Sequence, residues 1–287
     1  MTLGGDDLVL CAGTLPRETP WTDRLAAAAR AGFTGMSVWA RDYAAARHDG
    51  WSDADLRAQL ADHGLAVAEL DPAWWWTPGD VDVAALVAID DMEVFRYGEA
   101  EMFAIADALG ARSINAADVL GGRWGVDDAA AAFAGLCDRA AEHGLLVHLE
   151  FLPWSRIADL TTAWEVVRRA GRPNGGVAVD AWHWYRSGTP SDVATVRAIP
   201  GDKVLAIQLD DAPAEREPKL MSATLHERLL PGEGAIELTT LLGALREIGA
   251  TAPIGVEVFS DTLHALGPFD AAQRAADATR AVLAKVR

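Results

Sequence analysis

The sequence predicts an α/β protein with the (β/α)8 barrel, or TIM barrel, fold. Three observations lead to this prediction: eight short β-rich runs, amphipathic helical stretches between them, and carboxylates at the ends of three later runs. The chain has 287 residues, close to the ~250 that such a barrel usually needs. No Ser/Gly linker or low-complexity tract divides it, so we expect a single domain over residues 1–287.

The predicted strands are short apolar runs that give way to loops. The second, for example, reads TGMSVWA, and the sixth reads GGVAVDA. Eight such runs exceed what a doubly wound open sheet, the main alternative, usually needs. The runs cover residues 7–13, 34–40, 65–71, 112–118, 145–151, 175–181, 204–210 and 253–259.

The predicted helices are Ala- and Leu-rich stretches, and most of them end in glycine, as helix C-termini prefer. They cover residues 22–32, 53–64, 99–110, 129–144, 159–171, 237–250 and 270–287. The segment after the first strand, CAGTLPRETP, is not the glycine-rich phosphate loop that an open sheet often carries. The longest connections, 72–80 and 212–234, follow strands and therefore belong to the catalytic face of a barrel. We expect them to form lids.

Composition narrows the class of ligand. The formal net charge of −17 argues against nucleic acid, which is bound through clustered Lys and Arg. A small neutral or carbonyl-bearing molecule fits better. No stretch approaches the ~20 apolar residues of a membrane span, and the N-terminus lacks a signal-peptide pattern, so we expect a cytoplasmic protein without membrane contact. Cys11 and Cys137 are expected to be buried free thiols.

Carboxylates end three predicted strands: Glu150 in VHLEF, Asp180 in VAVDAWH and Glu257 in IGVEVF. A buried anion is costly unless it is paired or bound to a cation. With the amide oxygen of Gln208, these hard ligands suit Mg2+ or Mn2+ better than a structural zinc. The alternative is that they pair with rim arginines such as Arg156, Arg186 or Arg228.

Longer motifs carry a family resemblance: LEFLPW, VDAWHWYRSG, QLDDAP followed by HERLLPGEG, and VEVFS. With them the chain resembles the sugar phosphate isomerase/epimerase group with a xylose-isomerase-like barrel, which includes ketose 3-epimerases, inosose dehydratases and hydroxypyruvate isomerases. The resemblance implies that Glu150, Asp180 and Glu257 are metal ligands and that the two glutamates transfer protons. It also implies that His183 contacts a substrate oxygen.

The seventh strand departs from the family pattern, because many of these enzymes have a metal-binding histidine where this chain has Gln208. An amide oxygen is a weaker donor than imidazole for transition ions. We therefore expect Mn2+ or Mg2+ as the cofactor, with Co2+ or Zn2+ as alternatives.

Further site residues are predicted with open alternatives. His148 is expected either to orient Glu150 from one layer below or to fill the core. His226 and Arg228 are expected either to bind a substrate hydroxyl, carboxylate or phosphate or to be solvated loop residues. The aromatic run that includes Trp75, together with Trp154 and Trp182, is expected to wall the pocket; exposed aromatics could instead form a homo-oligomer contact.

A metal that polarises a carbonyl and its neighbouring hydroxyl stabilises the enediolate left when a carboxylate removes the α-proton. Proton return then gives epimerisation or isomerisation, and loss of a β-substituent gives elimination. We predict an isomerase or epimerase of a sugar or keto sugar, with Glu150 and Glu257 as the acid/base pair. The alternatives are a lyase acting on an inosose-like, dehydroshikimate-like or keto-glycoside substrate, and a non-catalytic binding subunit.

Other enzyme classes of this size are disfavoured. A Schiff-base aldolase needs a lysine at the catalytic end of a strand, and Lys203, Lys219 and Lys285 lie elsewhere in the predicted fold. A serine hydrolase needs a G-x-S-x-G elbow, which the sequence lacks.

Overall fold

A computed structural model describes residues 3–79, 96–118, 124–187 and 193–286. Its centre is a closed barrel of parallel strands in chain order, in which β8 pairs with β1. This confirms the predicted fold class and excludes the open sheet. The strands are β1 (Leu8–Leu10), β2 (Gly35–Trp39), β3 (Ala66–Ala73), β4 (Ser113–Ala117), β5 (Leu146–Glu150), β6 (Gly175–Asp180), β7 (Val204–Leu209) and β8 (Ile254–Val256).

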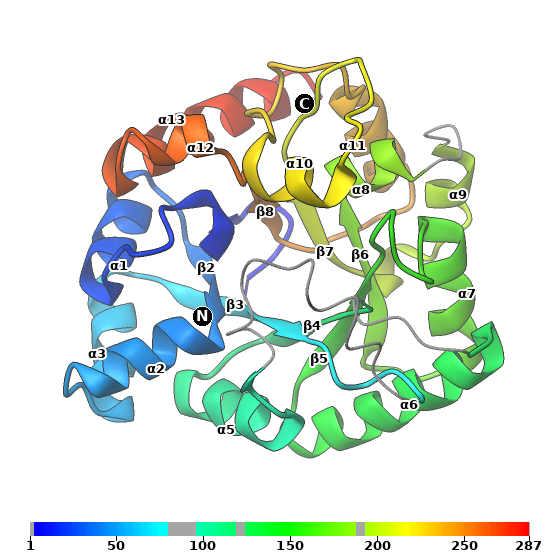
Figure 1. Ribbon diagram of the computed structural model, residues 1–287, viewed down its shortest axis with the longest axis horizontal. Helices are drawn as coiled ribbons and strands as arrows, with labels where there is room; N and C mark the ends of the chain where they lie inside the picture. Colours follow the sequence, from blue (N-terminus) through cyan, green and yellow to red (C-terminus); the bar gives the residue numbers. More distant parts are fainter. Residues whose placement is uncertain (1–2, 80–95, 119–123, 188–192, 287) are drawn as a thin grey trace.

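Helices surround the barrel, as Figure 1 shows. The seven predicted ones are found as α1 (Trp21–Arg30), α3 (Asp53–Asp62), α5 (Glu99–Leu109), α6 (Val126–Glu142), α7 (Leu160–Ala170), α11 (Leu238–Glu247) and α13 (Pro268–Leu283). Local signals fix their ends. In α7 the Asp159 carboxylate accepts a hydrogen bond from the Thr162 N–H at 2.7 Å, and Gly171 ends the helix with φ 64°.

Shorter helices were not predicted, since four to nine residues carry little 3.6-residue periodicity. They are α2 (Ala40–His48), α8 (Ala181–Arg186), α9 (Val193–Arg197), α10 (Leu220–His226) and α12 (Asp261–His264), with 3-10 turns η1 (Ala12–Thr14) and η3 (Gly201–Lys203). Three of them, α2, α8 and α12, begin within five residues of the end of a strand. They therefore border the catalytic end of the barrel.

Side chains alternate across the strands, as expected for a barrel. In β5, Val147 and Leu149 are fully buried against the helices, while His148 and Glu150 face the interior. Cys11 and Cys137 are buried free cysteines, as predicted. Cys11 lies just after β1 rather than within it, and Glu257 likewise lies one residue after β8.

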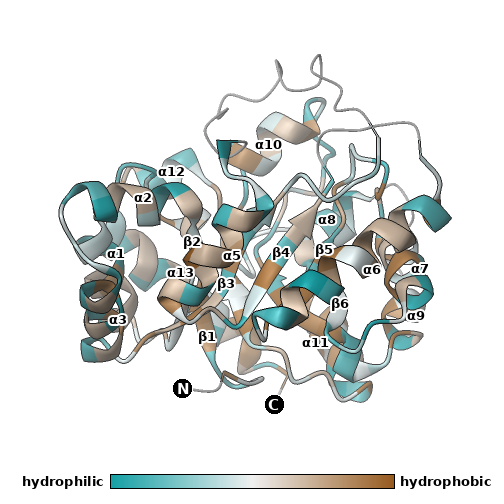
Figure 2. Ribbon diagram, turned by 90° about the horizontal axis from the view of Figure 1, so that it is seen from below, coloured by the Kyte–Doolittle hydropathy of each residue, from teal (hydrophilic) through white to brown (hydrophobic). Residues whose placement is uncertain are grey.

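Strand register brings the polar residues to one level. Asp180 in β6 pairs with Gln208 in β7, and Gln208 pairs with Gly255 in β8. Figure 2 shows α10, which belongs to the predicted 212–234 lid, standing beyond this end of the barrel. Within the described parts of the chain, no helix is both long and apolar enough to cross a membrane.

Candidate metal centre

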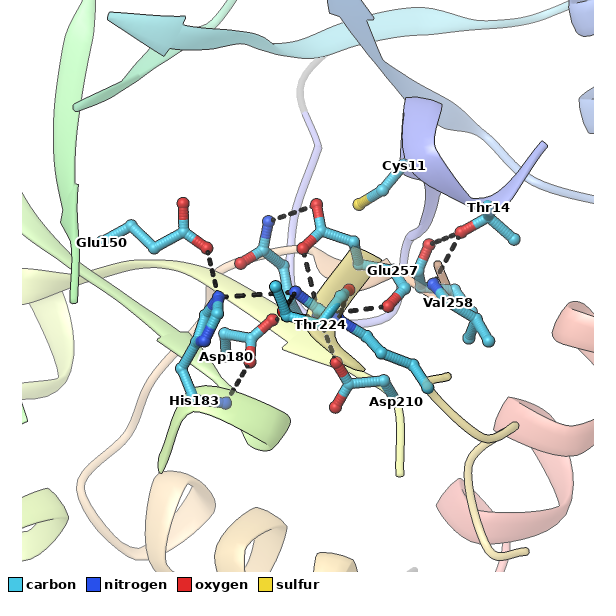
Figure 3. Close-up of polar contacts among 12 residues, drawn as sticks. Cys11, Thr14, Glu150, Asp180, His183, Asp210, Thr224, Glu257 and Val258 are labelled. Atoms are coloured by element: carbon cyan, nitrogen blue, oxygen red, sulfur yellow. Dashed lines mark hydrogen bonds and ion pairs between the residues drawn. The ribbon is translucent and has the colours of Figure 1, made fainter. Parts of the chain in front are cut away.

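Glu150, Asp180 and His183 converge on one point, with ligand atoms within 4.8 Å of one another. The spacing of Asp180 and His183 has a local cause: Asp180 caps α8 by accepting a hydrogen bond from the His183 N–H at 2.6 Å. The imidazole Nε2 then lies 3.4 Å from Glu150 Oε1. Figure 3 shows the three side chains directed toward one another.

Gln208 and Glu257 complete the predicted ligand set. The Gln208 amide nitrogen donates to Glu257 Oε1 at 3.1 Å. Its oxygen, Oε1, is buried and has no hydrogen-bond partner among the described residues. A Cβ on the neighbouring Gly255 would lie 3.3 Å from Gln208 Cγ and 3.0 Å from Cys11 Sγ, so glycine gives the glutamine its room.

Arg228 lies among these carboxylates rather than in a solvated loop, and only 2% of its surface is exposed. Its Nη1 lies 2.8 Å from Asp180 Oδ2 and 3.2 Å from Glu257 Oε2, and it also contacts Asp210. The arginine alternative is therefore realised for Asp180 and Glu257. Glu150 has other partners: His183 and, at 2.6 Å, the Asn115 amide.

The buried carboxylates of the site outnumber the cations that face them. Burial raises the pKa of Asp180, but His183, Arg228 and the His183 N–H together hold that pKa below its usual value. Burial raises the pKa of Glu257, and the nearby Glu150 adds to this against the opposing effect of Arg228. Burial and Asp180 likewise raise the pKa of Asp210. One guanidinium thus does not compensate all the carboxylates, and a further cation would stabilise them.

A second polar layer supports the site. Asn115 donates to Asp71 Oδ1 at 2.8 Å as well as to Glu150, and the Trp39 indole donates to Asp71 Oδ2 at 2.9 Å. Burial, followed by repulsion from Glu150 and Glu69, raises the pKa of Asp71 to about 7.

His148 lies in this layer and is fully buried. Of its two predicted roles, the structure favours the core one, because its Nε2 faces Glu69 Oε2 at 3.0 Å. The residue that orients Glu150 is Asn115, which sequence reasoning missed. Asn115 and His148 are register partners on β4 and β5. Asp71 was missed too, although it ends the predicted third run, residues 65–71; in the structure β3 continues to Ala73.

The donor set fits a divalent ion. Two buried carboxylates and one imidazole offer ligand atoms within 4.8 Å of one another, and the buried amide oxygens of Gln208 and Asn115 have no described partner. Carboxylate and amide oxygens are typical ligands of Mg2+ or Mn2+, and an imidazole also suits transition ions such as Zn2+. Glu150, Asp180 and His183 are the residues that could hold an ion. Of the other predicted ligands, Glu257 is not among the ligand atoms that lie within 4.8 Å of one another, and the Gln208 amide nitrogen contacts it.

A cavity of about 370 Å3 opens above the acidic cluster. Asp71, Glu150, His183 and Glu257 lie at its base, and Phe259 forms part of its wall. This volume is at the lower end of the range for small-molecule sites.

The tryptophan predictions hold in part. Trp154 lines the cavity, and so does Trp74. Trp75 does not line it and is 43% exposed, while Trp182 is fully buried behind the wall. Trp182 and Trp154 both contact the His183 ring edge-to-face, with centroids at 5.4 and 5.6 Å, so Trp182 supports His183 instead of meeting substrate.

Part of the predicted lid lies at the cavity. Met221, Thr224 and Leu225 of α10 line it together with His226. His226 Nδ1 lies 3.0 Å from Asp261 Oδ1 in α12. Of the other predicted lid, Pro72 and Trp74 line the cavity, and Asp80 lies outside the described residues.

Residues 25–285 match the protein family described as the xylose isomerase-like TIM barrel. The chain belongs to the xylose isomerase-like TIM barrel family. This confirms the resemblance drawn from the sequence motifs.

Similar proteins of this family are enzymes. The chain is 30% identical to a 3-dehydroshikimate dehydratase of Pseudomonas aeruginosa over 273 residues, which cover 90% of this chain and 38% of that protein. It is 30% identical to an inosose isomerase of Bacillus velezensis over 152 residues, 52% of each chain. The chain thus spans less than two thirds of these curated relatives.

Among solved structures, the IolI protein with a bound zinc atom superposes with a TM-score of 0.82. At 22% identity it covers 98% of this chain and 99% of its own. The similarity at this identity establishes the barrel fold.

Proposed function

We propose that this chain is a divalent-metal-dependent isomerase or epimerase of a cyclic keto sugar or similar keto polyol. The observation that carries the proposal is the placement of Glu150 and Glu257 at the base of one cavity, from β5 and from the end of β8. Strands five and eight are separated in the barrel order. Their carboxylates can therefore approach a bound ring from different sides.

Each side chain has a separate role in the proposed reaction. A bound ion, Mn2+ or Mg2+ by our proposal, would polarise the carbonyl and its neighbouring hydroxyl. Glu150, whose Oε2 accepts from Asn115, would take the α-proton. Glu257, at the base of the same cavity, would return a proton. His183 Nε2, beside Glu150 and at the cavity wall, would hold a substrate oxygen.

Dehydration is the second candidate. The length of the matched segment favours dehydration, because the alignment with the dehydratase covers 90% of this chain and the alignment with the inosose isomerase covers 52%. The same residues would serve: Glu150 would remove the α-proton, and His183 would donate a proton to the departing β-hydroxyl.

The experiment is proton exchange in deuterated water with the Mn2+-loaded protein, using 3-dehydroshikimate and an inosose as substrates. Deuterium at the α-carbon of a product of unchanged composition supports isomerisation or epimerisation. Loss of water supports the dehydratase. Variants Glu150→Gln and Glu257→Gln should abolish either reaction.

Absence of exchange in the loaded wild-type protein with both ketones would contradict proton abstraction from these substrates. Absence of any bound ion after dialysis against Mn2+ would leave the binding-subunit alternative.

A further inference from the structure

Asn115 lies between two carboxylates of the cavity base. Its amide nitrogen, Nδ2, donates to Asp71 Oδ1 at 2.8 Å and to Glu150 Oε2 at 2.6 Å. The three side chains come from the neighbouring strands β3, β4 and β5. The NH2 group of an amide carries two N–H donors, so each carboxylate takes one of them and none is left for another acceptor.

The amide of Asn115 has a fixed direction because its two ends differ. Turned over, it would place the acceptor Oδ1 against two carboxylates, which only accept hydrogen bonds when they are ionised. In the direction found, Oδ1 is buried and has no hydrogen-bond partner among the described residues. The two carboxylates therefore decide which way the amide faces, and its oxygen stays without a described partner.

Asp71 is held on its other side by Trp39. The indole Nε1 donates to Asp71 Oδ2 at 2.9 Å, and an indole N–H can only donate. The Trp39 ring is fixed by its own neighbours, because Phe259 stacks on it with centroids 6.0 Å apart and the Arg41 guanidinium lies 4.2 Å from the ring centre. Position 71 therefore faces one donor from Trp39 and one from Asn115.

A carboxylate at position 71 meets both donors, and its amide analogue does not. Asparagine has one oxygen and one NH2 group. If its oxygen faced the indole, its NH2 group would face the NH2 group of Asn115. If its oxygen faced Asn115, its NH2 group would face the indole N–H. In either case one hydrogen bond is replaced by two donors that face each other.

The series of hydrogen bonds ends at Glu150. Asn115 fixes Glu150 Oε2, and the other oxygen, Oε1, lies 3.4 Å from His183 Nε2 (Figure 3). Within the described parts of the chain, Asn115 is the residue that donates a hydrogen bond to this carboxylate. The direction of the Asn115 amide therefore sets how Glu150 presents its second oxygen to the candidate metal centre.

We propose that Asp71 is a positioning residue: through Asn115 it holds the Glu150 carboxylate in the direction in which it binds the ion and takes the α-proton. This inference rests on the proposed roles of Glu150 and adds a residue that acts through a second side chain. Partners that hold a metal ligand in place typically change metal affinity by about tenfold to 100-fold.

Mn2+ affinity tests the inference at pH 8, above the pKa of about 7 of the Asp71 carboxyl. Calorimetry on the full chain measures the dissociation constant of Mn2+. Asp71→Asn should raise this constant about tenfold to 100-fold. Trp39→Phe removes the indole donor but leaves Asp71 facing Asn115, so it should change the constant only slightly.

The double variant Trp39→Phe/Asp71→Asn decides between position and charge. Without the indole N–H, the new amide can turn its oxygen to Asn115, so we expect most of the Mn2+ affinity lost in Asp71→Asn to return. The double variant has the same charge as Asp71→Asn. A role of Asp71 through its charge alone therefore predicts no recovery.

Glu69→Gln is the matched control for the loss of a buried negative charge. Glu69 is buried like Asp71, but it faces His148 at 3.0 Å instead of Asn115. Glu69→Gln should weaken Mn2+ binding less than Asp71→Asn does, and the addition of Trp39→Phe should not restore the affinity.

The inference is overturned if the double variant binds Mn2+ no better than Asp71→Asn. It is also overturned if Asp71→Asn binds Mn2+ as the wild type does, or if the wild type binds none. Thermal unfolding checks that each variant is folded. Where Asp71→Asn does not fold, Asp71→Ala replaces it: it should weaken Mn2+ binding too, and Trp39→Phe should not restore the affinity because alanine has no oxygen to turn.

α-Proton exchange on the same variants separates the inference from the proposed function. In an active protein, Asp71→Asn should lower kcat more than it changes KM. The expected series of Mn2+ affinities without exchange in any protein supports the positioning role and contradicts the proposed function. Exchange in the wild type that Asp71→Asn leaves unchanged does the reverse.

Discussion

Asp180 Oδ2 lies 2.8 Å from Arg228 Nη1, with both side chains almost fully buried. The same carboxylate group accepts the His183 N–H through Oδ1. Asp180 is thus at once a helix cap, an arginine partner and a proposed metal ligand. It follows that Arg228 and a bound ion both stabilise one set of carboxylates.

We predict that Arg228→Gln makes the stability of the protein strongly metal-dependent. Removing one partner of a buried ion pair costs about 3–5 kcal/mol, so the metal-free variant should unfold at a much lower temperature than the wild type. Mn2+ should raise the unfolding temperature of the variant more than that of the wild type.

Arg186→Gln is the matched control for this prediction. Arg186 is also buried, and its Nε lies 2.7 Å from Glu217 Oε2, outside the ligand cluster. Its loss should destabilise the protein without enlarging the effect of Mn2+. Equal Mn2+ effects in both variants would show that Arg228 and the ion do not share carboxylates.

A second prediction concerns pH. The Asp71 carboxyl has a pKa of about 7 in the folded protein and an ordinary value of 3.8. Between these values the folded protein keeps a proton that the unfolded chain has released. Folding therefore binds a proton in this window, and the contribution of Asp71 to the free energy of unfolding falls as pH rises from about 4 to 7.

Ion binding should oppose the fall of stability with pH, because a bound cation stabilises the ionised form of the carboxylates near it. We expect Mn2+ binding to release more protons at pH 6 than at pH 8, and Mn2+ affinity to rise with pH through about 7. Calorimetry at pH 6 in two buffers of different ionisation enthalpy measures the protons released. Identical binding enthalpies in the two buffers would contradict the prediction.

The barrel was predictable because each unit carries its own local signals. An alternating apolar run marks a strand, and a glycine such as Gly171 at the end of an amphipathic stretch marks the end of a helix. The short helices α8 and α10 were not predictable in this way. They are too short to show a 3.6-residue period, and the 212–234 connection that carries α10 is held by contacts between distant segments, such as Arg228 with Asp180 of β6.

The candidate site was predictable where strand geometry alone determines it. Glu150 and Asp180 end β5 and β6, and Gln208 lies one residue before the end of β7. All three face inward because of the two-residue period. The partners of buried groups were not predictable: that His148 faces Glu69 and that Arg228 enters the acidic cluster follow from side-chain reach across several strands. Trp75 and Trp182 were wrongly predicted to wall the pocket, because neighbouring tryptophans in one segment can point to solvent, to the cavity or to the core.

Gln208→Ala provides the third prediction. The Gln208 Oε1 atom is buried without a described partner, which is costly unless an ion or another donor uses it. We expect the substitution to weaken Mn2+ binding by about tenfold or more and to leave the fold intact. Gln273→Ala, on the exposed face of α13 where Gln273 donates to Asp277, should leave affinity unchanged. Unchanged affinity in Gln208→Ala would remove this residue from the ligand set.

Two neighbouring tryptophans give the fourth prediction. Trp74 lines the cavity, whereas Trp75 does not line it and is 43% exposed. Loss of an aromatic contact with substrate should raise KM about tenfold in Trp74→Ala, with kcat changed less, while Trp75→Ala should change KM less than about twofold. The measurement is α-proton exchange at varied concentration of whichever ketone reacts. If Trp75→Ala raised KM as much as Trp74→Ala, both side chains would meet substrate, and the cavity would have to extend to the exposed side of this connection when the ligand binds.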